Sequence, residues 1–169
     1  MRVRGFEIVS RLERSNIEVK LPRRSTKDSA GYDFFAYEDV TIPPSITFHT
    51  MPDENRNFKK FWDIKPTYVP TGIKAYMRED EELDLYNRSS NPKKLGLILP
   101  HSVGIVDSDF YNNPDNEGEI QFSFYNLLPV PVTIKKGDKI GQGIFRKFLK
   151  ADFDDSNEAR MGGMGSTGN

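Results

Sequence analysis

The chain has 169 residues, with 24 lysines and arginines against 25 aspartates and glutamates, no cysteine, and two histidines, His49 and His101. This length fits one domain with a sizeable core, and the near balance of charge predicts no nucleic-acid partner and no attraction to anionic membranes. The lack of cysteine excludes a disulfide framework and a thiolate zinc site, and two separate histidines exclude a histidine cluster.

The N-terminal segment also bears on where the protein works. Residues 1–21 carry charges throughout, whereas a signal peptide needs an unbroken apolar segment. No stretch of the sequence approaches the roughly 20 apolar residues of a membrane-spanning helix. We therefore expect a cytoplasmic protein with no membrane partner.

Short apolar segments, separated by frequent prolines and glycines, predict a mostly β protein. The helix candidate is a single turn after Asn91, with Pro92 at its first position. The strand candidates, in chain order, are FEIVS at 6–10, IEVKL at 17–21, DVTIPP at 39–44, and two strands around a Lys-Gly-Asp turn at 130–145.

Two segments depart from this strand pattern. Residues 51–66 are polar and basic apart from a few apolar and aromatic side chains, which predicts an elaborated loop inserted between two strands. The acidic segment ADFDDSNEAR, at 151–160, leads into a Gly-rich C-terminal arm at 156–169. We therefore expect one β domain over 1–155 with an insertion at about 51–66, and an arm at 156–169. By composition alone, the arm is either a frayed terminus or a mobile flap that closes over a ligand.

Two aspartates, Asp107 and Asp109, directly follow an apolar strand in the segment GIVDSDF. Strand alternation predicts that both lie on one face, where the chain enters a run of turn formers. An aspartate there can act as a general base that activates water or as an indirect magnesium ligand. Solvated turn residues give the same pattern, so the segment by itself leaves both interpretations open.

Three further segments carry candidate ligand-binding groups. Arg88 stands beside Ser89 and Ser90, and a guanidinium with neighbouring hydroxyls suits phosphate oxygens. Asp33 lies in an aromatic strand, and Gln142 lies between two glycines. Each segment alone is also typical of a surface loop or a packed strand.

The order of these segments is more specific than any one of them. The chain carries in turn AGYDFFA, NRSS, VGIVDSDF with GEI, KGDKIGQGIF and the terminal RMGGMGSTGN. In order and spacing they resemble the five motifs of the trimeric dUTPase family, from about Asp28 to the end of the chain. The resemblance implies an all-β fold, a distorted jelly-roll, with a C-terminal arm exchanged between the subunits of a homotrimer. It points to a phage or Gram-positive bacterial member.

The resemblance implies a reaction, the hydrolysis of dUTP to dUMP and pyrophosphate, which keeps uracil out of DNA. Asp107 would be the base that activates water for attack on the α-phosphorus. In the family, Mg2+ is held by the three phosphates and by waters, so Asp33 and Gln142 would act through water and no direct protein ligand is expected. The residues that match the phosphate-binding positions are Arg88, Ser89, Ser90 and Gln142.

The resemblance also implies a deoxyuridine site and a lid. Backbone groups of a hairpin at 101–124 would read the uracil edge, and the Phe110 ring would pack on the deoxyribose and leave no room for a 2′-hydroxyl. The deoxyuridine-site residues are His101, Gly104, Val106, Phe110 and Tyr111. The lid residues, contributed by a neighbouring subunit, are Arg160, Met164, Gly165, Ser166 and Thr167.

Two other functions stay open at this point. A dCTP deaminase of the same fold would need a catalytic glutamate and a pocket that accepts cytosine, which the segment VDSDF at 106–110 disfavours. A dUTPase-like regulatory protein would use the nucleotide-gated tail and the 51–66 insertion to bind a protein partner. Turnover measured beside partner capture separates these functions.

Overall fold

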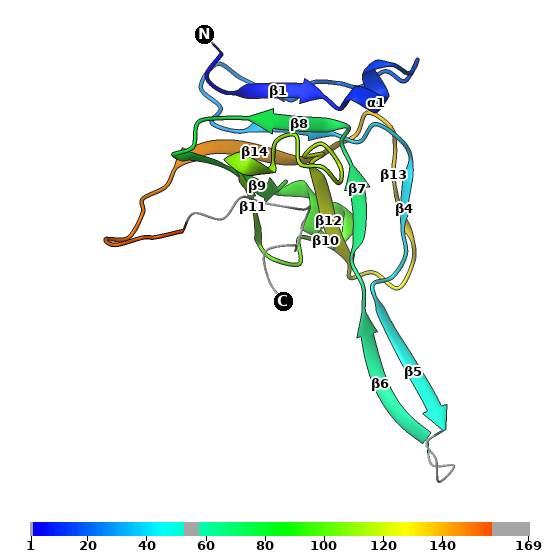
Figure 1. Cartoon of the computed structure of the whole chain (residues 1–169). Helices are drawn as coiled ribbons and strands as arrows, with labels where there is room; N and C mark the ends of the chain where they lie inside the picture. The colour runs from blue at the N-terminus through cyan, green and yellow to red at the C-terminus, as the bar shows by residue number, and fades with distance from the viewer. Residues whose placement is uncertain (1, 53–57, 157–169) are drawn as a thin grey trace.

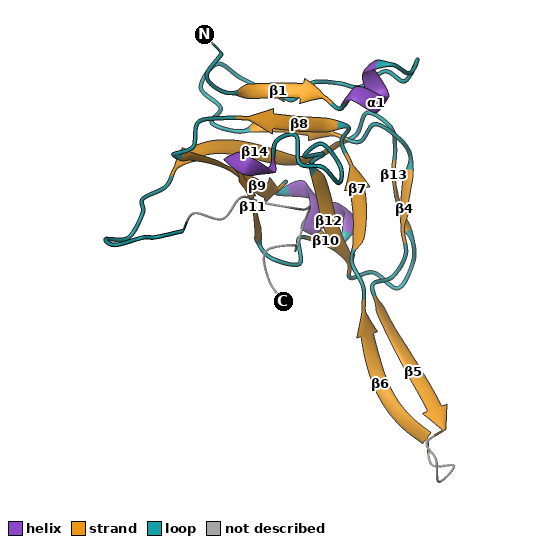
Figure 2. Cartoon of the chain, viewed as in Figure 1, coloured by secondary structure: helices purple, strands orange, loops and turns teal. Residues whose placement is uncertain are grey.

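The computed structural model describes residues 2–52 and 58–156 of the chain. Within these ranges the protein is almost entirely β, as Figure 1 and Figure 2 show, and the predicted all-β class is confirmed. The predicted arm at 156–169 lies outside the described residues from 157 onward. Among the helices in the described ranges, none is long and apolar enough to cross a membrane.

The elements are short. The helical segments are α1 (Ser10–Glu13), a π-helical turn (Asn91–Leu95) and a 3₁₀ turn (Ser108–Phe110). The strands are β1 (Gly5–Ile8), β2 (Arg23–Arg24), β3 (Tyr32–Phe35), β4 (Val40–Ile42), β5 (Ile46–Pro52), β6 (Phe58–Ile64), β7 (Thr67–Pro70), β8 (Ile73–Tyr76), β9 (Glu81–Asn87), β10 (Leu97–Ile98), β11 (Val103–Asp107), β12 (Gln121–Asn126), β13 (Val132–Ile134) and β14 (Lys139–Lys147).

The strands pair into one five-stranded sheet and several smaller ones. The five-stranded sheet has the order β11-β9-β14-β3-β2, and a three-stranded sheet has the order β10-β12-β7. β1 pairs with β8, β13 with β4, and β5 with β6. All of these described pairings are antiparallel, and many join strands far apart in the sequence.

Aromatic side chains fill the core between the two larger sheets. Phe34 of β3 and Phe122 and Phe124 of β12 are fully buried, and the rings of Phe34 and Phe122 lie 5.5 Å apart. A Cβ on Gly141 would lie 1.9 Å from the Phe122 ring, and one on Gly143 would lie 2.6 Å from Phe34. The two glycines of β14 therefore make room for rings whose burial contributes roughly 1.5–3 kcal/mol each.

The predicted strands in the first part of the chain are confirmed with one exception. The first three residues of FEIVS lie in β1, whereas Ser10 begins α1, and DVTIPP contains β4. Residues 17–21 form no strand, so that prediction is wrong. Val19 packs against the core, but Ile17 and Leu21 remain about half exposed. A strand is stabilised by burial of its apolar face and by pairing with another strand. This segment buries little apolar surface and pairs with none of the described strands.

The two strands predicted around the Lys-Gly-Asp turn exist as β13 and β14. They do not pair with each other: β13 pairs with β4, and β14 pairs with β3 and β9. Gly137, with φ of 85°, supplies the left-handed backbone of the turn between them. The turn predicted after Asn91 is confirmed as the π-helical turn, with Pro92 in its first positions.

Residues 51–66, expected as a loop, instead belong largely to a β-hairpin. β5 and β6 pair from Ile46 opposite Ile64 to Pro52 opposite Phe58, and Figure 1 shows the hairpin projecting from the body of the protein. The loop prediction is wrong because the threonines of β5 and the aromatic residues of β6 favour extended backbone once a partner strand is present.

Candidate active site

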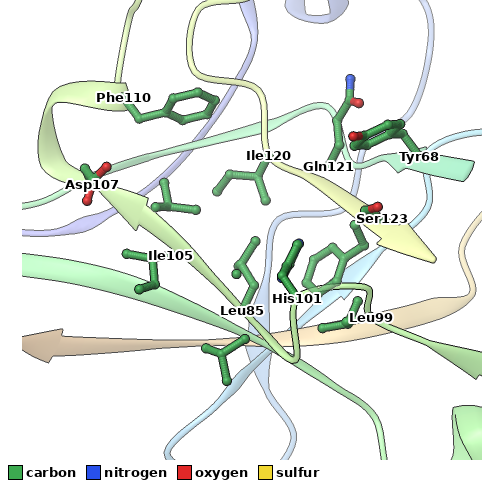
Figure 3. A pocket seen from close by; sticks show the side chains of 14 residues that line it. Tyr68, Leu85, Leu99, His101, Ile105, Asp107, Phe110, Ile120, Gln121 and Ser123 are labelled. Carbon is green, nitrogen blue, oxygen red and sulfur yellow. The ribbon is translucent and has the colours of Figure 1, made fainter. Parts of the chain in front are cut away.

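A pocket of about 490 Å³ opens between β11 and β12. Its lining is mostly apolar with a few polar groups, as in small-ligand sites. Figure 3 shows one wall formed by β11, which ends at Asp107, and another formed by β12, with Gln121 and Ser123. The lining residues are Tyr68, Leu85, Leu99, His101, Val103, Gly104, Ile105, Val106, Asp107, Phe110, Ile120, Gln121, Phe122 and Ser123.

The pocket lies between strands that pair elsewhere. β11 is the edge strand of the five-stranded sheet and pairs with β9, whereas β12 pairs with β7 and β10. The hairpin expected at 101–124 is therefore wrong, because its two strands belong to different sheets and leave space between them. Backbone groups along an edge strand remain available to a ligand.

Asp107 is the last residue of β11 and lies opposite Glu82 of β9. The preceding Val106 is buried, whereas Asp107 is exposed and lines the pocket. The chain then enters the 3₁₀ turn, which ends the strand alternation on which the shared face of Asp107 and Asp109 was predicted. The structure brings Asp107 to the pocket, and Asp109 is not among its lining residues.

The two aromatic candidates after Asp107 separate. Phe110 is 5% exposed and lines the pocket. Tyr111 turns away: its hydroxyl donates to a Glu7 carboxylate oxygen at 2.5 Å, and its ring packs edge-on against Tyr76 with centroids 6.1 Å apart. Burial, together with the Glu7 carboxylate, raises the pKa of Tyr111. Tyr111, expected at the deoxyuridine site, is therefore a support outside the pocket.

The remaining candidates of this group meet at the pocket. His101, Gly104 and Val106 all line it. A Cβ on Gly104 would lie 3.1 Å from the His101 imidazole and 3.3 Å from Leu85 Cβ. A glycine at this position therefore avoids close contacts with these two side chains in the pocket wall. Together with Phe110, these residues form a narrow, largely apolar cavity beside the Asp107 carboxylate.

Asp33 lies at the centre of a second polar group. It is 3% exposed and lies opposite Gln142 across the β3-β14 pairing. Its Oδ2 accepts hydrogen bonds from Lys139 Nζ at 2.7 Å and Ser25 Oγ at 2.5 Å, and its Oδ1 accepts one from Gln142 Nε2 at 3.0 Å. Burial disfavours the charged form, but these donors together lower the pKa of Asp33. The carboxylate is therefore charged and held in place.

Arg88 lies beside this group. It follows the end of β9, and its NH1 donates to the Lys139 carbonyl oxygen at 2.8 Å. Ser89 is exposed and Ser90 is half-buried, immediately before the π-helical turn. The structure thus brings Arg88 and the two serines to the end of the sheet that also carries Asp33.

Several supporting residues could not be picked out from the sequence. Buried Asn91 pins the turn after Ser90, because its Nδ2 donates to the Ile140 carbonyl at 2.9 Å and to Asn87 Oδ1 at 2.8 Å. An asparagine before proline signals only a helix start. The missed residues that contact Asp33 or line the pocket with polar groups are Ser25, Lys139, Tyr68, Gln121 and Ser123.

Within one chain, Asp107 and the Arg88 group lie at opposite ends of β9, although the pocket beside Asp107 runs along β11 between them. Asp107 is opposite Glu82, near the start of that strand, whereas Arg88 follows its last residue, Asn87. The path from Glu82 to Asn87 spans roughly 17 Å at about 3.4 Å per residue. The two groups are therefore too far apart to contact the same small chemical group. The predicted lid residues, Arg160, Met164, Gly165, Ser166 and Thr167, lie outside the described residues.

Comparisons of sequence agree on one family. A dUTPase family model matches residues 60–168. The chain is 44% identical over 170 residues to the deoxyuridine 5'-triphosphate nucleotidohydrolase of Lactococcus lactis, with 99% of both chains covered. It is 32% identical over 155 residues to the protein of that name from Finegoldia magna, with 88% of this chain and 91% of the other covered.

Solved structures give the same picture. The dUTPase from Streptococcus mutans matches with a TM-score of 0.69 and 38% identity, over 88% of this chain and 98% of that one. A dUTPase from phage phi11 of S. aureus matches with a TM-score of 0.64 and 16% identity, over 93% and 98% of the two chains, a likeness in fold alone. These matches confirm the jelly-roll predicted from the sequence, and the exchange of the arm stays a prediction.

Proposed function

This chain belongs to the dUTPase family, and from that membership we propose that it hydrolyses dUTP to dUMP and pyrophosphate by attack of an Asp107-activated water on the α-phosphorus. The observation that carries the role of Asp107 is its position. Its exposed carboxylate ends β11 at the pocket, one turn before Phe110. A nucleoside bound in the pocket would present its 5′ phosphates there.

The proposed reaction exchanges one bond at the α-phosphorus for another. The water oxygen bonds to phosphorus while the bond from phosphorus to the bridging oxygen of the β-phosphate breaks, and pyrophosphate leaves. The Asp107 carboxylate accepts a proton from that water, a contribution of roughly 10²–10⁴-fold in rate. Phosphoryl transfer otherwise needs alignment and charge neutralisation, which binding groups supply.

We assign the nucleoside to the pocket between β11 and β12. Gly104 and Val106 lie along its β11 wall, where backbone groups of an edge strand can hydrogen-bond to the uracil edge, and His101 lies at one end. Phe110 would pack its apolar ring on the deoxyribose and exclude a 2′-hydroxyl by steric contact. This volume suits one nucleoside, and the triphosphate would extend past Asp107.

We further propose that a second copy of the chain completes the site in a homotrimer. In the proposed complex Asp107 contacts the water that attacks the α-phosphorus, so the phosphates extend from the Asp107 end of β9, whereas Arg88 of the same chain lies roughly 17 Å away along that strand. Arg88, Ser89, Ser90 and Gln142 of a neighbouring copy would bind the phosphates, the guanidinium through paired donors. The arm at 156–169 would then close over the bound nucleotide as a lid.

Mg2+ is the proposed cofactor, and the surroundings of Asp33 fit an indirect role. Asp33 Oδ2 already accepts two hydrogen bonds, from Lys139 and Ser25. Oδ1 accepts one from Gln142, which leaves that oxygen capacity to accept another from a water. Asp33 and Gln142 would hydrogen-bond to water molecules that are bound to the Mg2+ ion. The ion would neutralise negative charge on the phosphate oxygens.

Pyrophosphate release measured separately with dUTP, UTP, dCTP and dTTP tests the proposal. We expect dUTP to be turned over at least about a hundredfold more efficiently than the others, because the pocket would exclude both the ribose hydroxyl and the thymine methyl. Ammonia release from dCTP would instead indicate the deaminase, and nucleotide binding without turnover would indicate the regulatory function. The comparisons favour neither alternative.

A further inference from the structure

The loop that follows Phe110 folds back onto the Phe110 backbone. The Phe110 carbonyl oxygen accepts two hydrogen bonds from Asn113, one from the backbone N at 3.3 Å and one from Nδ2 at 3.0 Å. Gly118, with φ of 80°, packs against the same oxygen, and a Cβ there would lie 2.3 Å from it. The orientation of this carbonyl is therefore fixed from two directions.

Asn113 is built into the loop through both ends of its side-chain amide. The residue is 5% exposed. Its Oδ1 accepts hydrogen bonds from the backbone N of Asp115 at 3.0 Å and of Asn116 at 3.2 Å, and its Nδ2 also donates to Asn116 Oδ1 at 2.8 Å. The Nδ2 position faces two acceptor oxygens, those of Phe110 and Asn116, so this position requires a donor.

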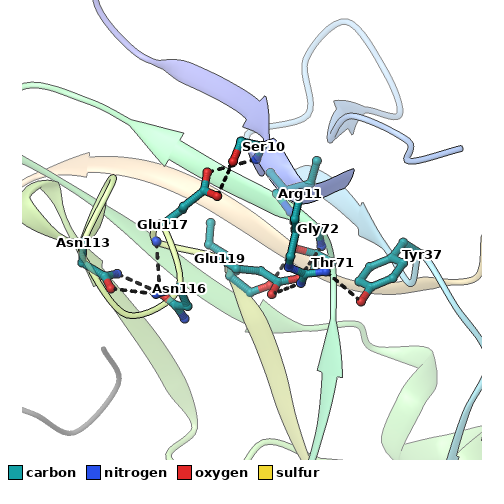
Figure 4. A network of polar contacts seen from close by, with 12 residues as sticks. Ser10, Arg11, Tyr37, Thr71, Gly72, Asn113, Asn116, Glu117 and Glu119 are labelled. Atoms are coloured by element: carbon teal, nitrogen blue, oxygen red, sulfur yellow. Dashed lines mark hydrogen bonds and ion pairs between the residues drawn. The ribbon is translucent and has the colours of Figure 1, made fainter. Parts of the chain in front are cut away.

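Other contacts anchor the loop as a whole (Figure 4). Ser10 donates to the Glu117 carboxylate from its backbone N at 3.0 Å and from its hydroxyl at 2.5 Å. Lys74 Nζ donates to Asn112 Oδ1 at 2.6 Å and to Glu117 at 3.3 Å. These bonds tie the loop to the N-terminal segment and to β8. Loss of the side-chain donor of Asn113 at the Phe110 carbonyl therefore leaves the loop attached.

We infer that Asn113 is a positioning residue for discrimination against ribose, because its amide fixes the backbone from which the Phe110 ring enters the pocket wall. The inference rests on the proposed function, in which Phe110 excludes the 2′-hydroxyl. The ring is nearly buried, so its position beside the sugar depends on the direction in which the backbone presents it. A rotated Phe110 peptide would widen the space beside the sugar.

The ratio of kcat/KM for dUTP to kcat/KM for UTP tests the inference. Asn113→Asp keeps the acceptor for the two backbone N–H groups but places an oxygen against the Phe110 carbonyl. We expect this ratio to fall roughly five- to tenfold, with a smaller change in kcat for dUTP. The matched control is Asn112→Asp, one residue earlier, which keeps an acceptor for Lys74 and should leave the ratio unchanged.

A double-mutant cycle separates positioning from a general loss of structure. In a Phe110→Ala background, Asn113→Asp should leave the dUTP to UTP ratio unchanged, because the ring through which it acts is gone. An equal fall in both backgrounds would overturn the inference. So would an unchanged ratio for Asn113→Asp in the otherwise wild-type protein.

A second variant covers the case in which Asn113→Asp does not fold. Asn113→Ala has no side-chain donor for the Phe110 carbonyl and introduces no charge into the loop, so the ratio should fall in the same direction. Thermal unfolding verifies that each variant is folded. A wild-type protein with no preference for dUTP over UTP would contradict the proposed function, whereas wild-type preference with unchanged variants would contradict only the role of Asn113.

Discussion

Asp107 and Asp33 are both placed by strands of the five-stranded sheet, yet their surroundings differ in every respect. Asp107 is exposed at the end of an edge strand beside an apolar pocket. Asp33 is 3% exposed in an inner strand and accepts hydrogen bonds from Lys139, Ser25 and Gln142. Those bonds lower the pKa of Asp33, so it is a weak proton acceptor. Surroundings, and not residue type, therefore distinguish the exposed carboxylate of Asp107, the proposed base, from the buried carboxylate of Asp33, which its donors hold in place.

The largest effect should come from the exposed carboxylate. Asp107→Asn should lower kcat for dUTP by roughly 10³-fold, because the amide keeps the shape of the side chain but cannot accept the proton of the attacking water. Binding of a non-hydrolysable dUTP analogue should be nearly unchanged. The control is Asp109→Asn, outside the pocket lining, with kcat near wild type. Reversal of the two results would assign the base to Asp109.

The next test asks whether the Asp107 pocket and the Arg88 group act in one chain or across two. Asp107→Asn and Arg88→Ala should each be nearly inactive alone. After subunit exchange in an equal mixture, roughly a quarter of the sites would combine an intact pocket with an intact Arg88 from another copy. Recovered turnover and a trimer mass by light scattering are the expected readings. A mixture as inactive as its components would place both groups in one chain.

The inner carboxylate should matter more for folding than for chemistry. Asp33→Asn should lower the free energy of unfolding at pH 7 by roughly 1–3 kcal/mol, since Lys139 loses its buried partner, and should reduce kcat less than Asp107→Asn does. Because the pKa of Asp33 is lowered in the folded state, its contribution is present near neutral pH and is lost as the pH falls through that lowered value.

Urea unfolding at pH 7 and at pH 3 measures this contribution to stability. The matched control is Asp39→Asn, an exposed aspartate that pairs with Lys135 on the surface, and it should change stability little. Equal losses from Asp33→Asn and Asp39→Asn would mean that burial of the Asp33 pair adds no stability.

The smallest effect should come from a third carboxylate, that of Glu117. Its case shows that a lowered pKa does not by itself identify a functional site. Hydrogen bonds from the Ser10 hydroxyl and backbone N lower the pKa of Glu117 to about 2, although this residue joins the loop after Phe110 to the N-terminal segment. The stability that it contributes is present above about pH 4.5 and is lost as the pH falls toward 2.

Glu117→Gln should therefore lower stability slightly at pH 7 and match wild type at about pH 2, as followed by thermal unfolding between these values. The control is Glu13→Gln, an exposed glutamate on α1, which should show no such convergence. A constant difference between Glu117→Gln and wild type across this pH range would contradict the role of the Glu117 charge.

The ordered motifs predicted the β class and the residues that meet at each end of the sheet. His101, Gly104, Val106, Asp107 and Phe110 converge on one pocket, although no single segment distinguished them from ordinary turn or strand residues. Local pattern could predict that these segments are strands. It could not predict that β11 and β12 pair with other strands and enclose a pocket, because such pairing depends on contacts between distant segments.

Tyr111 was predicted in the wrong place, and Lys139 and Ser25 were missed, for different reasons. Tyr111 was expected at the sugar because it follows Phe110, but the 3₁₀ turn after Asp107 directs it toward Glu7, a residue more than a hundred positions away. Lys139 and Ser25 gave no signal in sequence because a lysine after a turn and a serine in a polar segment are common. Their importance comes only from the buried charge of Asp33 between them.

The β5-β6 hairpin is attached to the body of the protein through Ser45, the residue before β5. Ser45 is 4% exposed, and its backbone N donates to the Asn126 carbonyl at 3.0 Å while its Oγ accepts from Asn126 N at 2.8 Å. The first residues beyond it, Ile46 and Ile64, are about half exposed, and β5 and β6 pair with each other and with none of the other described strands. The hairpin is therefore a modular appendage, whose length evolution or engineering can change by pairs of residues without altering the register of the five-stranded sheet.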